Sequence, residues 1–271
     1  MKMIAAIDDS PVAQPVLDTA IALARLLDLE IDAVHVTNRG GTSASGLAGA
    51  AGLTIRQLTG NPVDALADAL NDPDVAIGVV GARGHTGGPH PAGHATLALL
   101  QRTGTPLVVV PPELCRPASK RMDRILVPLD GSVDTTTAVQ SFVTNLSSAG
   151  VEVITLHVFT RDTVPRFIDQ TQHGLKAWTS EFSARHDMGT CPRLVTRSGS
   201  PGQSVINLAI SEDVDMIVIG WSQNLLPGRA QVVAEVLAQS CVPVLLVPVS
   251  GHSLDNQPLD DNDADKIRTT A

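Results

Sequence analysis

The stretch Val75–Thr96, VAIGVVGARGHTGGPHPAGHAT, joins an apolar run to a glycine-rich segment and a helical pattern. The run Val75–Val80 predicts a buried strand and Gly93–Arg102 predicts a helix, so the glycines from Gly81 onward lie on a strand-to-helix turn. Glycine lets the backbone approach a ligand closely, and the first N–H groups of a helix have no partner inside it. The turn is therefore a candidate anion site, although a plain surface loop has the same pattern.

The second half of the chain repeats the first. MIAAIDDS near the N-terminus matches ILVPLDGS 122 positions later, and the same offset places His35 opposite His157. Gly81 matches Gly220 at an offset of 139, and the last apolar runs, TPLVVVP and VPVLLVP, match at 137. We infer a tandem duplication in which the length changes lie between elements, where loops tolerate them.

Strands and helices alternate in each half. Apolar runs rich in Val, Ile and Leu suit a parallel sheet that is covered on both faces, and Pro11–Leu27 has the helical spacing, with Ser10 as N-cap. The sequence predicts an α/β fold of two tandem doubly wound domains with helices on both faces of each sheet. First-half strands are expected near residues 3–8, 30–36, 53–59, 75–80 and 106–111. Arg39–Gly52 is expected to form a loop or short helix and Val164–His186 a longer helix.

The expected domains are residues 1–112 and 123–249, joined by a linker at 113–122 and followed by an acidic tail at 250–271 that is expected to be disordered. We interpret three basic residues in or beside the linker as solvated charges: Lys120, Arg121 and Arg124.

Composition excludes several functions. The net charge is −9, which argues against nucleic acid or an anionic membrane as the main partner. The chain has no Tyr, four Phe and two Trp, so stacking on exposed bases is not expected. The apolar run at the N-terminus is cut short by Asp8, and no segment has the length of a membrane span, so we expect a cytoplasmic protein.

Cysteine and histidine spacing indicates neither a disulfide framework nor a metal site. Cys115, Cys191 and Cys241 are widely separated and lack a CxxC pair, so reduced thiols are expected. His85, His90 and His94 are irregularly spaced in the glycine-rich loop and are interpreted as surface residues.

Asp8 and the Gly81 turn are the candidate binding features of the first half. In an open parallel sheet, ligands bind at the carboxyl ends of strands where the strand order reverses. If the first and fourth strands are neighbours, Asp8 and Gly81 meet at one crevice. A carboxylate there can accept hydrogen bonds from a purine amine or ribose hydroxyl, and helix-terminal N–H groups suit phosphate.

On these residues the sequence resembles the universal stress protein family, whose nucleotide-binding members carry G-x2-G-x9-G followed by Ser or Thr. Gly81 and Gly84 supply G-x2-G, eight residues then precede Gly93 instead of nine, and His94 stands at the Ser or Thr position. The resemblance implies a five-stranded parallel sheet in the order 3-2-1-4-5, ATP in the crevice with or without Mg²⁺, and domain pairing through the last strand.

The resemblance also implies roles for individual residues. It places Ala6, Ile7, Asp8 and Val36 around the adenine, Gly81, Arg83 and Gly84 near the ribose and phosphates, and Gly93, His94, Ala95 and Thr96 on the phosphates. Arg83 has the alternative interpretation of a solvent-facing loop residue.

The second half departs further from this pattern. Trp221 and Gln223 follow Gly220 where small residues are expected, and Ala230 and Gln231 replace the final Gly and Ser. We expect this half to fold but to bind no triphosphate, with Asp130 capping the next helix.

The leading hypothesis is a regulatory stress-response protein that binds ATP in its first domain, hydrolyses it slowly or not at all, and acts on an unidentified protein partner. The rival is a nucleotide-free interaction protein built as an internal pseudo-dimer, and homodimerisation stays open. A small-molecule enzyme ranks third among the hypotheses. The sequence has neither a GxxxxGK[ST] loop nor a G-x-S-x-G elbow, the motifs that would support enzymatic chemistry. The last strands, Leu107–Val110 and Val244–Val247, are expected to pair, since bare apolar edges attract partners.

Overall fold

A computed structural model describes residues 1–8, 13–37, 52–82, 92–116, 121–160, 171–185, 193–224 and 230–249, with side chains of the 171–185 helix from residue 177 onward. The first half comprises β1 (Lys2–Ala6), α1 (Ala13–Leu27), β2 (Glu30–Thr37), β3 (Ile55–Thr59), α3 (Pro62–Leu70), β4 (Val75–Gly81), α4 (His94–Arg102) and β5 (Leu107–Val110). The second half comprises β6 (Arg124–Pro128), α5 (Val133–Ser148), β7 (Glu152–Phe159), α6 (Thr171–Arg185), β8 (Arg193–Ser198), α7 (Pro201–Ser211), β9 (Met216–Trp221), α8 (Gln231–Gln239) and β10 (Val244–Pro248).

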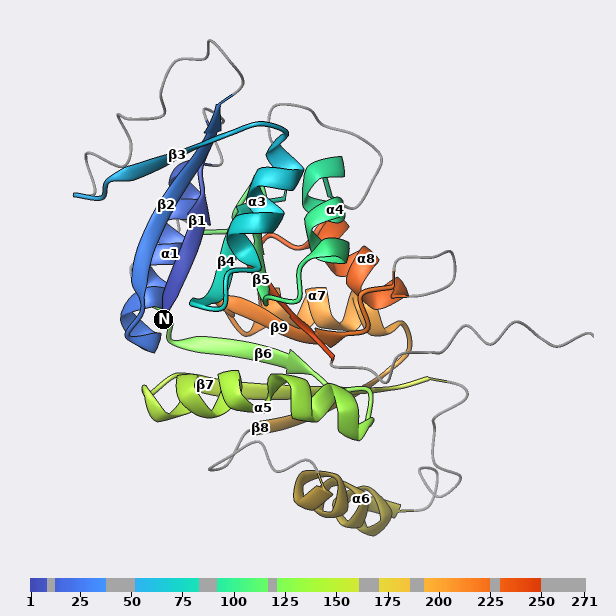
Figure 1. Ribbon diagram of the computed structural model, residues 1–271. Coiled ribbons are helices and arrows are strands. Elements are labelled where there is room, and N and C mark those ends of the chain that lie inside the picture. The colour runs from blue at the N-terminus through green and yellow to red at the C-terminus, as the bar shows by residue number, and fades with distance from the viewer. Residues whose placement is uncertain are drawn as a thin grey trace, which may run out of the picture.

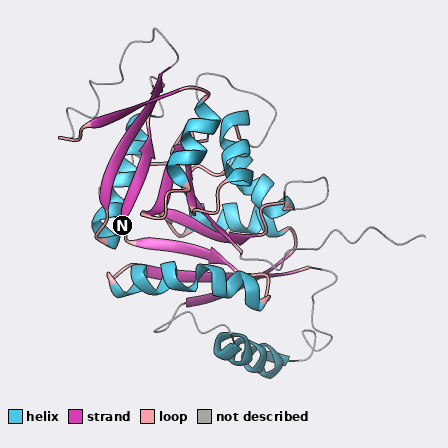
Figure 2. Cartoon of the chain, viewed as in Figure 1, coloured by secondary structure: helices cyan, strands magenta, loops and turns pink. Residues whose placement is uncertain are grey.

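All ten strands form one sheet in the order β3-β2-β1-β4-β5-β10-β9-β6-β7-β8 (Figures 1 and 2). Within each half the strands run parallel, and each half has the predicted order 3-2-1-4-5. The repeat in the sequence is therefore a repeat in the fold, and the prediction of two doubly wound α/β units is confirmed.

The two halves meet through β5 and β10, which pair antiparallel. Val109 lies opposite Val244, and Leu107 opposite Leu246. Each of these side chains is at most 1% exposed, so the seam between the halves is as dry as the centre of either sheet. This confirms the predicted pairing of the last strands. Both strands are apolar, so neither has the polar or charged side chains that would let it remain as an exposed sheet edge.

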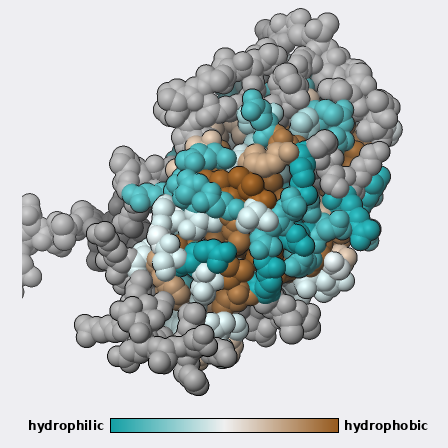
Figure 3. Space-filling model, turned by 180° about the vertical axis from the view of Figure 1, so that it is seen from behind, coloured by the Kyte–Doolittle hydropathy of each residue, from teal (hydrophilic) through white to brown (hydrophobic). Residues whose placement is uncertain are grey.

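Helices cover both faces of the sheet. On one face α1 contacts β1, β2 and β4, and α5 contacts β7, β9 and β10. On the other, α3 packs against α4 and α7 against α8. Each face has one apolar cluster that includes residues of both halves, so the core is continuous across the seam. From the side opposite to Figure 1, apolar residues gather in the middle of the visible surface with hydrophilic residues beside them (Figure 3).

The local sequence explains where several helices begin. Asn61 accepts hydrogen bonds from the N–H groups of Val63 and Asp64, and Pro62 opens α3, a position where its missing N–H costs nothing. Ser132 caps α5 by accepting the N–H of Thr135 at 3.2 Å. The predicted caps of α1 lie outside the described residues, as does the expected loop at 39–51.

The helix expected at Val164–His186 is present as α6, Thr171–Arg185; residues 161–170 lie outside the described part. Its Trp178 and Phe182 pack against His157 of β7, with ring centroids 5.0 and 4.9 Å away. Phe159 joins this group at 4.9 Å from His157. The first half has no Phe or Trp to form such a group around His35, because every Phe and Trp of the chain follows residue 141.

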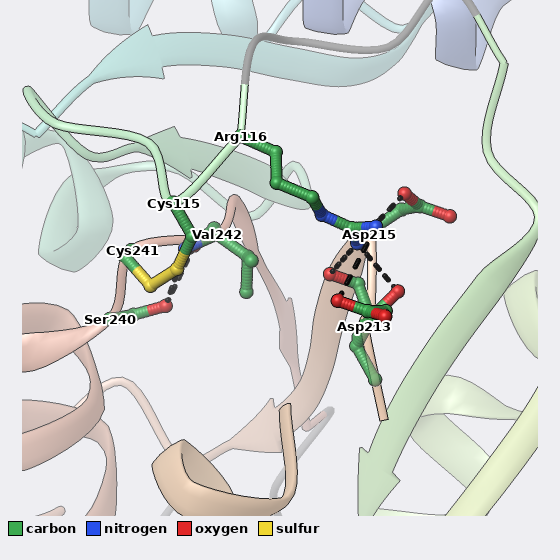
Figure 4. The surroundings of a disulfide bond; sticks show 8 residues. Cys115, Arg116, Asp213, Asp215, Ser240, Cys241 and Val242 are labelled. Carbon is green, nitrogen blue, oxygen red and sulfur yellow. Dashed lines mark hydrogen bonds and ion pairs between the residues drawn. A yellow bond between two sulfur atoms is a disulfide. The ribbon is translucent and has the colours of Figure 1, made fainter. Parts of the chain in front are cut away.

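The expectation of three reduced thiols is wrong for two of them. Cys115 and Cys241 form a disulfide, with their Cα atoms 5.0 Å apart (Figure 4). The N–H of Cys115 also donates to the carbonyl of Cys241 at 2.8 Å. The antiparallel seam explains this contact, because it places the chain that leaves β5 beside the chain that enters β10. Cys191 lies outside the described residues.

Ion pairs fix the linker to the second half. The Arg116 guanidinium lies 3.6 Å from carboxylate oxygens of both Asp213 and Asp215 and donates to the carbonyl of Asp213 at 2.6 Å (Figure 4). Arg124, interpreted from the sequence as a solvated charge, instead pairs with Glu152 at 2.7 Å and is only one-third exposed. Arg121 is exposed and pairs with Asp123, and Lys120 lies outside the described residues.

Candidate functional site

The candidate site of the first half lies at the carboxyl ends of β1 and β4. These strands are parallel neighbours, with Ala5 opposite Val79. Asp8 follows β1 and is exposed, and Gly81 ends β4. Asp8 and Gly81 therefore lie at the same edge of the sheet, as the sequence predicts, because neighbouring parallel strands end on the same side.

The glycine-rich loop is anchored at both ends. The N–H of Gly93 donates to the carbonyl of Ala82 at 2.7 Å, and the hydroxyl of Thr96 donates to the carbonyl of Gly81 at 2.8 Å. Gly93 is the N-cap of α4 and provides no side-chain cap. These bonds hold the start of α4 against the end of β4, so backbone N–H groups in the first turn of the helix lie beside the carboxyl end of β4.

A buried histidine holds the end of β1. The Nδ1 atom of His35 lies 2.8 Å from the carbonyl oxygen of Ile7, and the N–H of Ile7 donates to Val34 at 2.9 Å. Both polar backbone atoms of Ile7 are thereby used, directly before Asp8. The sequence aligned His35 with His157 in the repeat but gave neither residue a role.

The second half repeats this arrangement. The Nδ1 atom of His157 lies 2.9 Å from the carbonyl oxygen of Leu129, directly before Asp130. Burial lowers the pKa of His157 below its usual value, against the opposing effects of this hydrogen bond and of the Asp130 charge. Two copies of one hydrogen bond, each next to a strand-end aspartate, identify these histidines as positioning residues for the strand ends.

The structure describes nine of the eleven residues assigned to the crevice. Asp8, His94 and Ala95 are exposed; Ala6, Val36, Gly81 and Gly93 are half-buried; Ile7 and Thr96 are buried. Arg83 and Gly84 lie outside the described residues. The Thr96 hydroxyl already donates to Gly81, so in this structure Thr96 shapes the turn.

A cleft of about 580 Å³ opens at the matching edge of the second half. When the repeat is used to transfer the predicted first-half residues, all but one of their counterparts line this cleft; the exception is Gln223, the counterpart of Gly84. The counterparts that line it are Pro128, Leu129, Asp130, Val158, Gly220, Ser222, Ala230, Gln231, Val232 and Val233. Ten of the eleven second-half counterparts of the residues named from the sequence therefore surround one cavity.

Asp130 and Gly220 show how closely this cleft is built. Asp130 accepts the N–H of Ser132 at 2.8 Å, so it supports the cap of α5. A Cβ atom at Gly220 would lie 2.9 Å from the carbonyl oxygen of Thr135, a distance that real Cβ atoms do not reach. Only glycine allows the end of β9 to approach the start of α5 this closely.

Comparison with known proteins identifies the class. Residues 122–248 match the model of the universal stress protein family. A functionally unknown protein from Pseudomonas aeruginosa PAO1 has a similar structure, with a TM-score of 0.69 and 11% identity over 92% of each chain. A universal stress protein from Archaeoglobus fulgidus DSM 4304 has a TM-score of 0.65 and 16% identity, over 91% of this chain and 98% of its own. No curated protein matches the chain.

The second half of the chain belongs to the universal stress protein family, and the first half repeats the same fold. The two full-length matches are each below 25% identity and bear on the fold alone. In the part of the chain that the structure describes, no helix has both the length and the apolar character needed to cross a membrane.

Proposed function

We propose that this universal stress protein binds ATP, alone or with Mg²⁺, in the crevice of its first half and uses the bound nucleotide to regulate a protein partner in the cytoplasm. Asp8 and its neighbours at the end of β1 would contact the adenine. The loop that begins at Gly81 and the start of α4 would hold the phosphates.

One observation supports this proposal most strongly. The second-half counterparts of the residues assigned to the nucleotide surround a single cleft of about 580 Å³, which is within the range of small-molecule sites. Both halves share strand order and strand-end hydrogen bonds, so we expect the same positions to come together in the first half.

The residues at those positions make the first half better suited than the second to bind phosphate. Ala82 stands where the second half has Trp221, and Gly93 where it has Ala230. Smaller residues let backbone N–H groups come closer to phosphate oxygens. Arg83 would add a positive charge where the counterpart is Ser222.

Calorimetric titration of the whole chain with ATP, with and without Mg²⁺, tests the proposal. We expect saturable binding by the wild type and loss of binding in Gly84→Val, because the branched side chain would fill a close-approach position. Gly104→Val is the matched control: it adds the same side chain at an exposed glycine with nothing within 4 Å of its Cβ position. No heat of binding at millimolar ATP, or unchanged affinity in Gly84→Val, would refute the assignment.

We propose that the bound nucleotide is hydrolysed slowly or not at all. The expected result is phosphate release far slower than one turnover per second, the lower end of typical enzymatic rates. Release at one per second or faster would instead favour the enzyme hypothesis.

The second candidate function is a nucleotide-free interaction protein, and the β5–β10 seam favours it. That seam joins the halves into one sheet through the backbone pairing of two buried, apolar strands. It also uses the last strands, so another copy of the chain would have to pair through β3 or β8, where Arg56 and Arg197 are exposed. Charged edges of this kind oppose strand pairing. Absence of ATP binding in the calorimetric titration would favour the nucleotide-free interaction protein over the ATP-binding protein.

A further inference from the structure

The cleft of the second half differs chemically from a nucleotide site. It is formed by the carboxyl ends of β6, β7, β9 and β10 and by the starts of α5, α7 and α8. Much of its lining is apolar and includes Leu156, Val158, Val205, Ile219 and Trp221. Trp221 is the one aromatic residue among the described lining residues and is 4% exposed. A lining of this kind suits the apolar body of a small molecule.

The charged residues of the cleft are acidic. Asp130 and Asp134 line it beside Ser132 and Thr135, and the residues described in its lining include no Lys, Arg or His. Among the described lining residues these two carboxylates are the only charged groups, and they create a negative potential, which repels phosphate and attracts a positive group.

At the start of α5, two of the donors that could bind an anion are already used by side chains. The N–H of Ser132 donates to Asp130 at 2.8 Å, and the N–H of Thr135 donates to the Ser132 hydroxyl at 3.2 Å. The starts of α7 and α8 do favour an anion, since neither N-cap, Ser200 or Ala230, provides a side-chain cap. Each helix start corresponds to about half a positive charge, whereas the two carboxylates carry about two negative charges, so negative charge prevails among the described residues of the cleft and favours a cation.

We propose that this cleft binds a hydrophobic organic cation, an alkyl- or arylamine whose ammonium group pairs with Asp134 and Asp130 and whose apolar body lies against Trp221. This site is separate from the ATP crevice of the first half and does not depend on it. The duplicated fold then holds two sites of opposite charge preference.

Tryptophan fluorescence can test this proposal in the whole chain. Trp178 and Trp221 are the only tryptophans in the sequence, and Trp221 lines the cleft. In a Trp178→Phe background, Trp221 is the sole reporter. The probes are phenethylamine and hydrocinnamate, which share a phenyl ring and a short chain but carry opposite charges, and ATP.

We expect phenethylamine to change the fluorescence of Trp221 saturably at millimolar concentration, the affinity that so small a ligand reaches. Hydrocinnamate and ATP should leave the signal unchanged. Asp134→Asn should weaken phenethylamine binding roughly twofold to fivefold, as loss of an exposed ion pair does. Asp74→Asn removes the same charge from an exposed position outside the cleft and should have no effect.

Other results would overturn the proposal. These are no saturable response to phenethylamine, an equal response to hydrocinnamate, or a response of Trp221 to ATP. A ligand-dependent rise in the urea midpoint of the wild type gives a second readout if Trp178→Phe does not fold. Because ATP binding in the first half is measured by calorimetry and Gly84→Val, failure of either site is seen independently of the other.

Discussion

The disulfide between Cys115 and Cys241 should dominate the stability of the second half. The bond closes a loop of 126 residues that contains every element from β6 to α8. Closing a loop of this length lowers the chain entropy of the unfolded state by an amount worth about 5 kcal/mol at 25 °C, and measured effects are typically about 2–4 kcal/mol. With a slope of about 2 kcal/mol per molar urea, reduction should lower the urea midpoint by roughly 1–2 M.

Both tryptophans lie inside this loop, so their fluorescence follows unfolding of the enclosed half. The double variant Cys115→Ser/Cys241→Ser should unfold at the lower midpoint in either redox state. Cys191→Ser is the control and should keep the full difference between oxidised and reduced protein. Thiol titration of the unfolded, oxidised wild type should find one reactive thiol of the three present.

Equal midpoints for the oxidised and reduced wild type would refute the reasoning, and so would three reactive thiols in protein kept under oxidising conditions. The bond also bears on location. Cytosolic glutathione and thioredoxin keep most thiols reduced, so in a cytoplasmic protein the pair would be open unless oxidants accumulate. The thiol count in protein isolated under acid quenching therefore tests the predicted compartment as well.

Two further predictions concern single buried positions. Because burial lowers the pKa of His157, the unfolded chain takes up a proton more readily than the folded one, so stability present above the ordinary pKa of about 6.5 is lost as the pH falls towards the folded pKa. The urea midpoint should fall more between pH 7.5 and 5.5 in the wild type than in His157→Asn, and parallel curves would contradict this account. Gly78→Ala would press a methyl group against the side chains of Leu70 and Leu107 and should cost about 1–3 kcal/mol. Gly104→Ala, at an exposed glycine with open space, should change the free energy of unfolding by less than about 0.5 kcal/mol. Urea unfolding followed by circular dichroism measures both variants, and an equal loss of stability in the two would disprove the overlap.

The fold could be predicted to this extent because two signals agreed. The repeat fixed the order of elements twice, and the continuous apolar runs indicated a covered parallel sheet. The pairing of β5 with β10 followed from the apolar sequence of both strands. The boundaries of the first-half strands moved by at most two residues, as for β1, which ends at Ala6, where the sequence pattern runs on to Asp8.

Long-range contacts of single side chains could not be predicted. Cys115 and Cys241 are far apart in the sequence and have no spacing motif, so only the antiparallel seam shows that they meet. His35 shows the same limit, since a histidine inside an apolar strand gives no sign of which carbonyl it will contact. Arg124 resembled other linker charges until the fold placed Glu152 on the neighbouring strand.

The seam between β5 and β10 lets one polypeptide do what a dimer of identical subunits cannot. In such a dimer every substitution occurs twice, so both crevices must change together. Here Ala82 and Trp221 hold equivalent positions and differ, because each can be inherited separately. Because the two halves are covalently linked, they stay at one-to-one stoichiometry at any dilution. The binding site of one half can therefore change in evolution while the site of the other half keeps its original function.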